Sequence, residues 1–163
     1  MPTAATPAQP FAPATPTVDR PATAVTPYLM FDGNAREAMA FYQQHLGGEL
    51  GVMTYRESGA CEDATVPAAL LDRVIHARLA SGTLVLLASD TPGHTGPLQR
   101  GDDTYLNLAC ASVEALEHLY AALGEGGRGT LAPHDAFWGA RFAMLTDRFG
   151  VRWMLHHEYA RPA

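Results

Sequence analysis

The sequence predicts an α+β domain made of two consecutive βαβββ modules that follow a disordered tail. The first observation is that a strand, a helix and three strands occur in this order twice, so the second half repeats the first. The second is the closing stretch 137–158, where two runs rich in aromatic and branched residues flank Asp147 and Gly150. Asp and Gly favour a hairpin turn, which predicts that the domain ends in two paired strands.

Composition excludes several classes of function. The net charge of −6 argues against nucleic acid, because a phosphate-binding surface needs a basic face. All eleven basic residues are arginine, which excludes a Schiff-base or P-loop lysine. The chain shows neither a signal-peptide pattern nor a bilayer-spanning run, so we expect a cytoplasmic protein without a membrane partner. Cys61 and Cys110 have no CxxC spacing and are expected to be free thiols.

The chain divides into a tail and a folded part. Residues 1–24 are mostly Pro, Ala and Thr without an apolar pattern, which predicts a disordered tail. We expect the folded domain at 25–158, with a first module at about 25–90, a Pro- and Gly-rich linker at 91–102 and a second module at about 103–158. Residues 159–163 form a short C-terminal tail.

The first module begins with an extended run at 25–31. Asn34, with Glu37 three residues later, has the spacing of a capping box, so a helix is expected to begin there and to end at Gly47-Gly48. A strand at 49–56, a loop at 57–71 with one helical turn, and strands at 73–80 and 83–89 complete the module.

The second module follows the same order. A strand at 104–110 leads to Ser112, a predicted N-cap, and to a helix whose apolar residues recur at helical spacing until Gly124. A weak strand at 128–132 precedes the closing hairpin. The repeat aligns Leu79–Leu86 with Leu145–Met154, allowing for two extra residues.

Several motifs occur in a characteristic order over residues 25–157. They are Pro27-Tyr28-Leu29, Gly33-Asn34-Ala35-Arg36-Glu37-Ala38, Phe41-Tyr42, Leu46-Gly47-Gly48, Met53-Thr54-Tyr55, His76-Ala77, Ala88-Ser89-Asp90, Phe137-Trp138-Gly139 and Asp147-Arg148-Phe149-Gly150-Val151-Arg152-Trp153-Met154. In this order they resemble the vicinal oxygen chelate superfamily of glyoxalases, bleomycin-resistance proteins and extradiol dioxygenases, and its PhnB-like branch most. The resemblance implies that each sheet curls into a half barrel around a ligand cavity, with the helices outside, and that the protein is a homodimer. The methyltransferase label of some PhnB-like relatives gets no support, because no GxGxxG follows a strand.

Strand alternation then sorts side chains between the cavity and the helix. In the strand at 73–80, Ile75, Ala77 and Leu79 are expected under the helix, and Val74, His76 and Arg78 toward the cavity. In the second module the residues expected to face the cavity are Tyr105, Asn107, Phe142, Arg152, Met154 and His156, with Trp138 at its mouth.

The resemblance also implies four inward metal-ligand positions in metal-dependent relatives. By spacing, they hold Pro27, Leu86, Tyr105 and Met154 in this chain. Proline, leucine and methionine do not supply the nitrogen and oxygen ligands that such a metal requires. We therefore predict no metal site and no cofactor.

Histidines are the first candidates for chemistry. His76 suits a general base or a ligand-orienting donor, because imidazole titrates near neutral pH; the alternative is a buried histidine satisfied by a neighbour. His156 and His157 point to opposite faces of a strand, so they do not chelate together and are expected to be solvated or at an edge. His134 is assigned to a solvated loop.

The other candidates are aromatic, amide or basic. Trp138 is read either as a lid over an apolar ligand or as a structural aromatic residue. Arg78 and Arg152 are expected to pair with an anionic ligand or with carboxylates of the protein. The remaining predicted ligand contacts are Tyr105, Asn107, Phe142 and Met154.

Three functions remain open from sequence. The first is binding of a small apolar or aromatic molecule without the metal of the relatives. The second is an enzyme of isomerase, lyase or transferase type with glyoxalase- or dioxygenase-like ancestry, using His76 as base and Tyr105 or Asn107 to polarise a carbonyl. The third is a partner-binding module that uses the Pro-rich tail.

Overall fold

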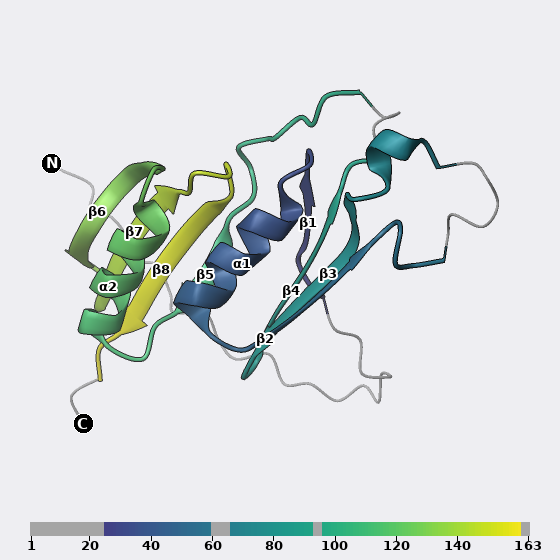
Figure 1. Cartoon of the computed structure of the whole chain (residues 1–163). Helices are drawn as coiled ribbons and strands as arrows, with labels where there is room; N and C mark the ends of the chain where they lie inside the picture. The colour runs from purple at the N-terminus through teal and green to yellow at the C-terminus, as the bar shows by residue number, and fades with distance from the viewer. Residues whose placement is uncertain (1–24, 60–65, 93–95, 161–163) are drawn as a thin grey trace, which may run out of the picture.

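The computed structural model describes residues 25–59, 66–92 and 96–160 and shows two four-stranded sheets, each carrying one helix (Figure 1). The predicted tail at 1–24, Cys61, and His94 of the predicted linker lie outside the described residues. The first module comprises β1 (Tyr28–Phe31), α1 (Ala35–Leu46), β2 (Glu49–Thr54), the 3-10 turn η1 (Ala68–Leu70), β3 (Val74–Ser81) and β4 (Leu84–Asp90). The second comprises β5 (Leu106–Ala109), α2 (Val113–Gly124), β6 (Arg128–Ala136), β7 (Ala140–Thr146) and β8 (Arg152–Glu158).

The two sheets have the same topology. The strand order is β1-β4-β3-β2 in the first sheet and β5-β8-β7-β6 in the second. In each, the first strand of the module pairs parallel to the last, and the other pairings are antiparallel. The prediction of an α+β fold with two βαβββ modules is therefore confirmed. Neither helix of the described chain is long and apolar enough to cross a membrane.

The register of the repeat differs from the predicted alignment. Leu79 pairs with Leu86 in the first module, and Leu145 pairs with Trp153 in the second. Leu86 therefore corresponds to Trp153, whereas the predicted alignment matched it to Met154. The second hairpin has only one more residue between its paired positions than the first, and two were predicted. Since adjacent strand residues face opposite sides, this correction moves Leu86 from the expected cavity face to the core.

The start of β3 also departs from simple alternation. The pairing between β2 and β3 shifts after Met53–His76, so that Thr54 pairs with Val74 and Ile75 is the extra residue of a bulge. Val74 is buried in the core, whereas it was expected on the cavity face. His76 keeps its predicted side of the sheet, because it lies beyond the bulge.

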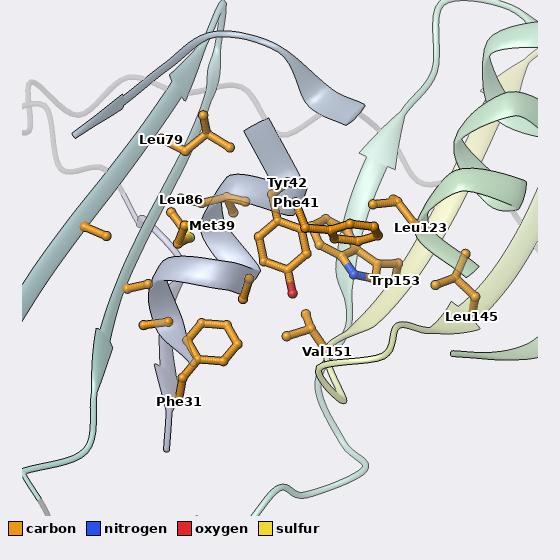
Figure 2. Packing of buried hydrophobic residues seen from close by; sticks show 14 of the residues in the cluster. Phe31, Met39, Phe41, Tyr42, Leu79, Leu86, Leu123, Leu145, Val151 and Trp153 are labelled. Atoms are coloured by element: carbon orange, nitrogen blue, oxygen red, sulfur yellow. The ribbon is translucent and has the colours of Figure 1, made fainter. Parts of the chain in front are cut away.

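A single hydrophobic core joins the modules. Each helix packs on its own sheet, and α1 also contacts α2. Tyr42 of α1 packs edge-on against Trp153 of β8, with 5.4 Å between ring centroids, and both are fully buried (Figure 2). Phe149, from the β7–β8 turn, contacts Phe31 and Phe41 of the first module.

The buried carboxylate of Asp147 ties this core together. Its Oδ2 accepts hydrogen bonds from Tyr42 Oη at 2.7 Å and from Trp153 Nε1 at 2.8 Å. Its Oδ1 accepts the backbone N–H groups of Phe149 and Val151, each at 2.9 Å. The predicted turn role of Asp147 is thus correct but incomplete, because the same side chain also bonds to the other module.

Tyr42 makes the stability of the protein pH-dependent. Burial and the adjacent Asp147 carboxylate raise the pKa of Tyr42 above its ordinary value. Because the folded-state pKa is raised, this stabilising contribution is complete below the unfolded pKa of about 10 and is lost as the pH rises further. Above about pH 10 the free energy of unfolding should fall about 1.4 kcal/mol per pH unit faster in the wild type than in Tyr42→Phe. Urea unfolding between pH 9 and 11 checks this; parallel profiles would contradict it.

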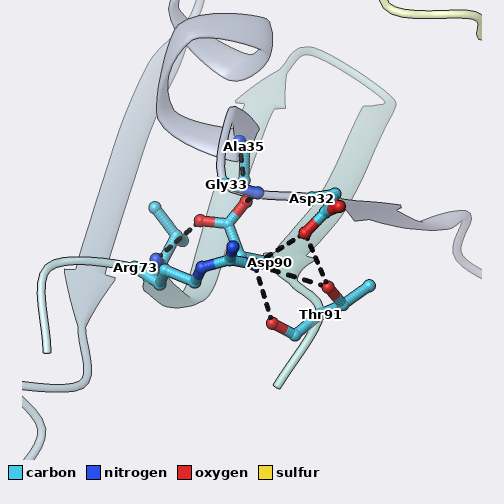
Figure 3. Close-up of polar contacts among 7 residues, drawn as sticks. Asp32, Gly33, Ala35, Arg73, Asp90 and Thr91 are labelled. Atoms are coloured by element: carbon cyan, nitrogen blue, oxygen red, sulfur yellow. Dashed lines mark hydrogen bonds and ion pairs between the residues drawn. The ribbon is translucent and has the colours of Figure 1, made fainter. Parts of the chain in front are cut away.

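The N-terminus of α1 is held by Asp90 from the end of β4. Asp90 Oδ1 accepts the backbone N–H groups of Gly33 at 2.8 Å and Ala35 at 3.0 Å, and Oδ2 accepts that of Val74 at 2.8 Å (Figure 3). Asn34 makes no side-chain capping hydrogen bond. The predicted capping box is therefore wrong, because a carboxylate distant in sequence already bonds the N–H groups at this helix end.

Other boundaries follow the sequence more closely. Ser112 caps α2 by accepting from Ala115 N at 3.1 Å, as predicted. The strand predicted at 128–132 is longer, because backbone pairing with β7 extends β6 to Ala136 despite Pro133. His134 is consequently a strand residue and not a loop residue. Residues 137–139 form the β6–β7 turn, so the first strand of the closing hairpin begins only at Ala140.

Candidate functional site

Each sheet has one face covered by its helix and an opposite face, which we call the open face. His76 and Arg78 of β3 lie on the open face of the first sheet, and both are exposed. The His76 ring is 6.3 Å from the ring of Tyr28 on β1. Among the described residues, His76 has no hydrogen-bond partner that would orient its imidazole. His76 is therefore not the buried, hydrogen-bonded histidine of the alternative interpretation, as far as the described residues go.

A polar and aromatic row crosses the open face of the second sheet. His156 Nδ1 lies 3.0 Å from Asn107 Oδ1 across the parallel pair β5–β8. On its other side His156 pairs with Phe142 of β7, which in turn pairs with His134 of β6. The His134 and Phe142 rings are 6.1 Å apart and nearly perpendicular. We call these four residues, Asn107, His156, Phe142 and His134, the second-sheet row.

The hydrogen bond between His156 and Asn107 fixes the tautomer of the neutral His156 ring. An amide oxygen only accepts, so Nδ1 of His156 carries the proton that bonds to Asn107. In the neutral ring Nε2 is then left as an acceptor. A histidine with a defined acceptor nitrogen can bind an O–H or N–H group of a ligand, or take a proton from it.

Trp138 and Met154 extend the row with apolar surface. Trp138, in the β6–β7 turn, has 55% of its surface exposed, and its ring lies 5.5 Å from that of Phe142. Met154 is half-buried and pairs with Asn107 on one side and Met144 on the other. Trp138 therefore adjoins the open face, and its large exposed surface is what a lid residue would have.

Arg152 and Tyr105 lie at the start of the second sheet, near the first module. The Arg152 guanidinium is 5.3 Å from the centre of the Tyr105 ring, and its Nη1 donates to the backbone oxygen of Asp102. Neither Arg78 nor Arg152 forms an ion pair with a carboxylate of the described residues. The expectation of protein carboxylates as their partners is therefore wrong for the described part of the chain.

The other predicted site residues form two groups on different sheets. Asn107, Phe142, Met154 and Trp138 lie together, whereas His76 and Arg78 belong to the other sheet. No hydrogen bond, ion pair or ring contact joins the two groups in the part of the chain that the structure describes. Sequence parity placed His156 on the correct face, but its bond to Asn107 depends on the parallel pairing of β5 with β8, which alternation within one strand does not reveal.

His157 occupies the opposite side of β8 from His156. Its Nδ1 lies 2.9 Å from the backbone oxygen of Cys110, next to the core. Burial raises the pKa of the Cys110 thiol, which makes the reactive thiolate less available at neutral pH. His157 and Cys110 therefore have structural surroundings, and the predicted placement of His156 and His157 on opposite sides of the strand is confirmed.

The residues present do not fit the metal of metal-dependent relatives. Met154 lies on β8 as expected, whereas Tyr105 and Pro27 precede β5 and β1 and are not on these strands. Leu86 is in the core, and the open-face residues beside it on β4 are Val85 and Leu87, which also lack donor atoms. Among the described residues, no three His, Cys, Asp or Glu side chains are grouped to hold a metal ion.

Comparison with known proteins identifies the class to which this fold belongs. A family model of the Glyoxalase/Bleomycin resistance protein/Dioxygenase superfamily matches residues 24–155. The chain belongs to this superfamily, so the expected resemblance is confirmed.

Three individual relatives are similar to this chain over most of its length. Protein YjdN of Escherichia coli (strain K12) is 30% identical over 146 residues, covering 85% of this chain and 97% of YjdN. The crystal structure of protein PA1353 from Pseudomonas aeruginosa is 39% identical, with a TM-score of 0.72 over 84% of this chain and 98% of that one. A proposed 3-demethylubiquinone-9 3-methyltransferase, PhnB protein, from Bacillus cereus is 22% identical, with a TM-score of 0.66 over 83% and 99% of the two chains, and shares the fold.

Proposed function

We propose that this protein binds a small apolar or aromatic molecule on the open face of the second sheet, as a homodimer and without a metal ion. The observation that carries this proposal is the second-sheet row, in which one oriented imidazole adjoins the ring of Phe142. Trp138 and Met154 add apolar surface beside it. A mostly apolar surface with one fixed polar pair is the usual composition of a small-molecule site.

The row also specifies what the ligand should contain. An aromatic ring would pack edge-on or offset against Phe142 and Trp138, contributing about 0.5–1.5 kcal/mol beyond its buried area. A hydroxyl or N–H group would donate to His156 Nε2, while Asn107 keeps the ring in the correct tautomer. The proposed ligand is therefore an aromatic molecule with one hydrogen-bond donor.

A second candidate function, an enzyme with His76 as general base, rests on the exposed imidazole of His76 and the adjacent Tyr28 ring. It is the weaker proposal, because His76 has no orienting partner among the described residues. It requires that His76→Ala abolish turnover of a substrate while the fold is retained.

Binding of 2-naphthol and its methyl ether, 2-methoxynaphthalene, tests the principal proposal by isothermal titration calorimetry. The wild type should bind 2-naphthol about tenfold more tightly, because only 2-naphthol donates a hydrogen bond, worth about 1–1.5 kcal/mol, to His156. His156→Leu should remove this preference. Phe142→Ala should weaken binding of both compounds by about fivefold, since both lose the aromatic contact.

His157→Leu is the matched control, because His157 lies on the opposite side of the same strand, and it should keep the tenfold preference. Failure of the wild type to bind either compound would refute the proposal. Native mass spectrometry of the same protein should show a dimer; stoichiometric divalent metal would refute the metal-free part.

A further inference from the structure

A pocket of about 300 Å³ lies at the seam between the two modules, away from the second-sheet row. Its walls come from β1, from the linker at 98–104, and from the first residues of β5 and β8. We call it the seam pocket. Its volume is at the lower end of the range of about 300–1,000 Å³ that is common for small-molecule sites.

Two arginines line the seam pocket, and each is held in place without a carboxylate. Arg100 Nη2 donates to the backbone oxygen of Met30 at 3.0 Å, and its guanidinium lies 5.3 Å from the centre of the Phe31 ring. Arg152 is held in the same manner by the backbone oxygen of Asp102 and the ring of Tyr105. In both cases one carbonyl and one aromatic ring fix the position of the cation.

Most N–H groups of these two arginines have no hydrogen-bond partner among the described residues. A guanidinium has five N–H donors, and each of these arginines donates one hydrogen bond to a carbonyl of the described residues. Among the described residues, the arginines in ion pairs are Arg56, Arg73 and Arg141, which all lie elsewhere. The seam pocket thus contains two positioned positive charges whose remaining donors have no partner in the described part of the chain, although the net charge of the chain is −6.

The other residues that line the pocket indicate what the rest of an anionic ligand should be. Leu29, Leu106 and Val151 provide an apolar wall. Among the described residues that line the pocket, Asp103 carries the one carboxylate. Its single negative charge offsets only part of the positive charge of the two arginines. Guanidinium groups bind carboxylates and phosphates through pairs of parallel hydrogen bonds.

We propose that the seam pocket binds a small molecule with one carboxylate, phosphate or phosphonate group and a compact apolar body. Arg100 and Arg152 would bind the oxyanion, and the leucines and Val151 would contact the body. This site is separate from the second-sheet row in position and in ligand chemistry. A ligand there would contact both modules, because β1 belongs to the first module and Arg152 and Val151 to the second.

Titration calorimetry of the full chain with phenyl phosphate, inorganic phosphate and benzamide tests this proposal. Phenyl phosphate should bind saturably and at least tenfold more tightly than benzamide, which has the ring without the charge. It should also bind more tightly than inorganic phosphate, which lacks the ring. Arg100→Gln and Arg152→Gln should each weaken phenyl phosphate binding about tenfold, the effect of losing a charged hydrogen bond.

Arg148→Gln is the matched control. Arg148 also lacks a carboxylate partner among the described residues and lies over the Phe41 and Phe149 rings, but it does not line the pocket. Its replacement should change the affinity less than twofold. An equal loss in Arg148→Gln, or the absence of saturable binding in the wild type, would overturn the proposal.

Asp103→Asn tests the same site without risk to the fold, because Asp103 is exposed. Removing the opposing carboxylate should tighten phenyl phosphate binding about threefold, as expected for one partly solvated like charge near the oxyanion. Unchanged or weaker binding would reject the pocket as the anion site. Binding of 2-naphthol by Arg100→Gln should remain intact, so failure at one site is distinguishable from failure at the other.

Discussion

Replacing Asp147 with alanine should lower the free energy of unfolding by about 3–5 kcal/mol, the range for removing one partner from a buried charged network. The reason is that four donors lose their acceptor at once. The Tyr42 hydroxyl and the Trp153 indole N–H are both fully buried, so they cannot bond to water instead. Urea unfolding followed by circular dichroism measures the change.

Two variants separate this network from a general loss of charge. Tyr42→Phe removes one donor and leaves the carboxylate with three, so it should cost about 1–2 kcal/mol. Asp72→Ala removes a carboxylate that is 82% exposed and pairs with Arg56 at the surface, and it should cost less than about 1 kcal/mol. Equal effects of Asp147→Ala and Asp72→Ala would show that the buried network does not stabilise the fold.

Replacing Asp90 with alanine should lower the free energy of unfolding by about 2–4 kcal/mol. This single side chain accepts the N–H groups of Gly33, Ala35 and Val74, and it holds the start of α1 against the sheet (Figure 3). Its loss leaves these donors without a partner and removes a negative charge from the positive end of the helix dipole. Thermal and urea unfolding of the variant provide the measurement.

The N-cap positions supply the controls for Asp90. Asn34→Ala should change the free energy of unfolding by less than about 0.5 kcal/mol, because its side chain makes no cap hydrogen bond. Ser112→Ala should cost about 1 kcal/mol, because Ser112 does cap its helix. A loss at Asn34 as large as at Ser112 would support the capping box predicted from sequence and would contradict the assignment of Asp90.

Local signals in the sequence account for much of the fold. The Gly47-Gly48 pair ends α1 at the predicted place, since Gly47 has a φ of 72°, which glycine adopts without strain. The apolar spacing of α2 and its Ser112 cap predicted both ends of the second helix to within one residue. These features depend on neighbours in the chain, which is why the sequence alone reveals them.

Features that depend on pairing between distant strands were less accessible. A bulge in β3 places Val74 in the core, and the hairpin register places Leu86 opposite Leu79. Both features change the face of the sheet that a residue occupies. A shift of one residue inverts the face, so spacing counted from a turn fails whenever a turn differs in length. For this reason Leu86 was wrongly matched to a metal-ligand position of the metal-dependent relatives.

The sequence by itself determined the two βαβββ modules, the superfamily and the face of most strand residues. It did so because hydrophobic period, caps and turn residues are properties of short segments. Only the tertiary structure decided that, among the described residues, His156 has an orienting partner and His76 has none, and that Arg100 and Arg152 line one pocket. It also decided that the closing hairpin binds the first module through Asp147 and Tyr42, since contacts over a hundred residues apart arise only when the modules pack.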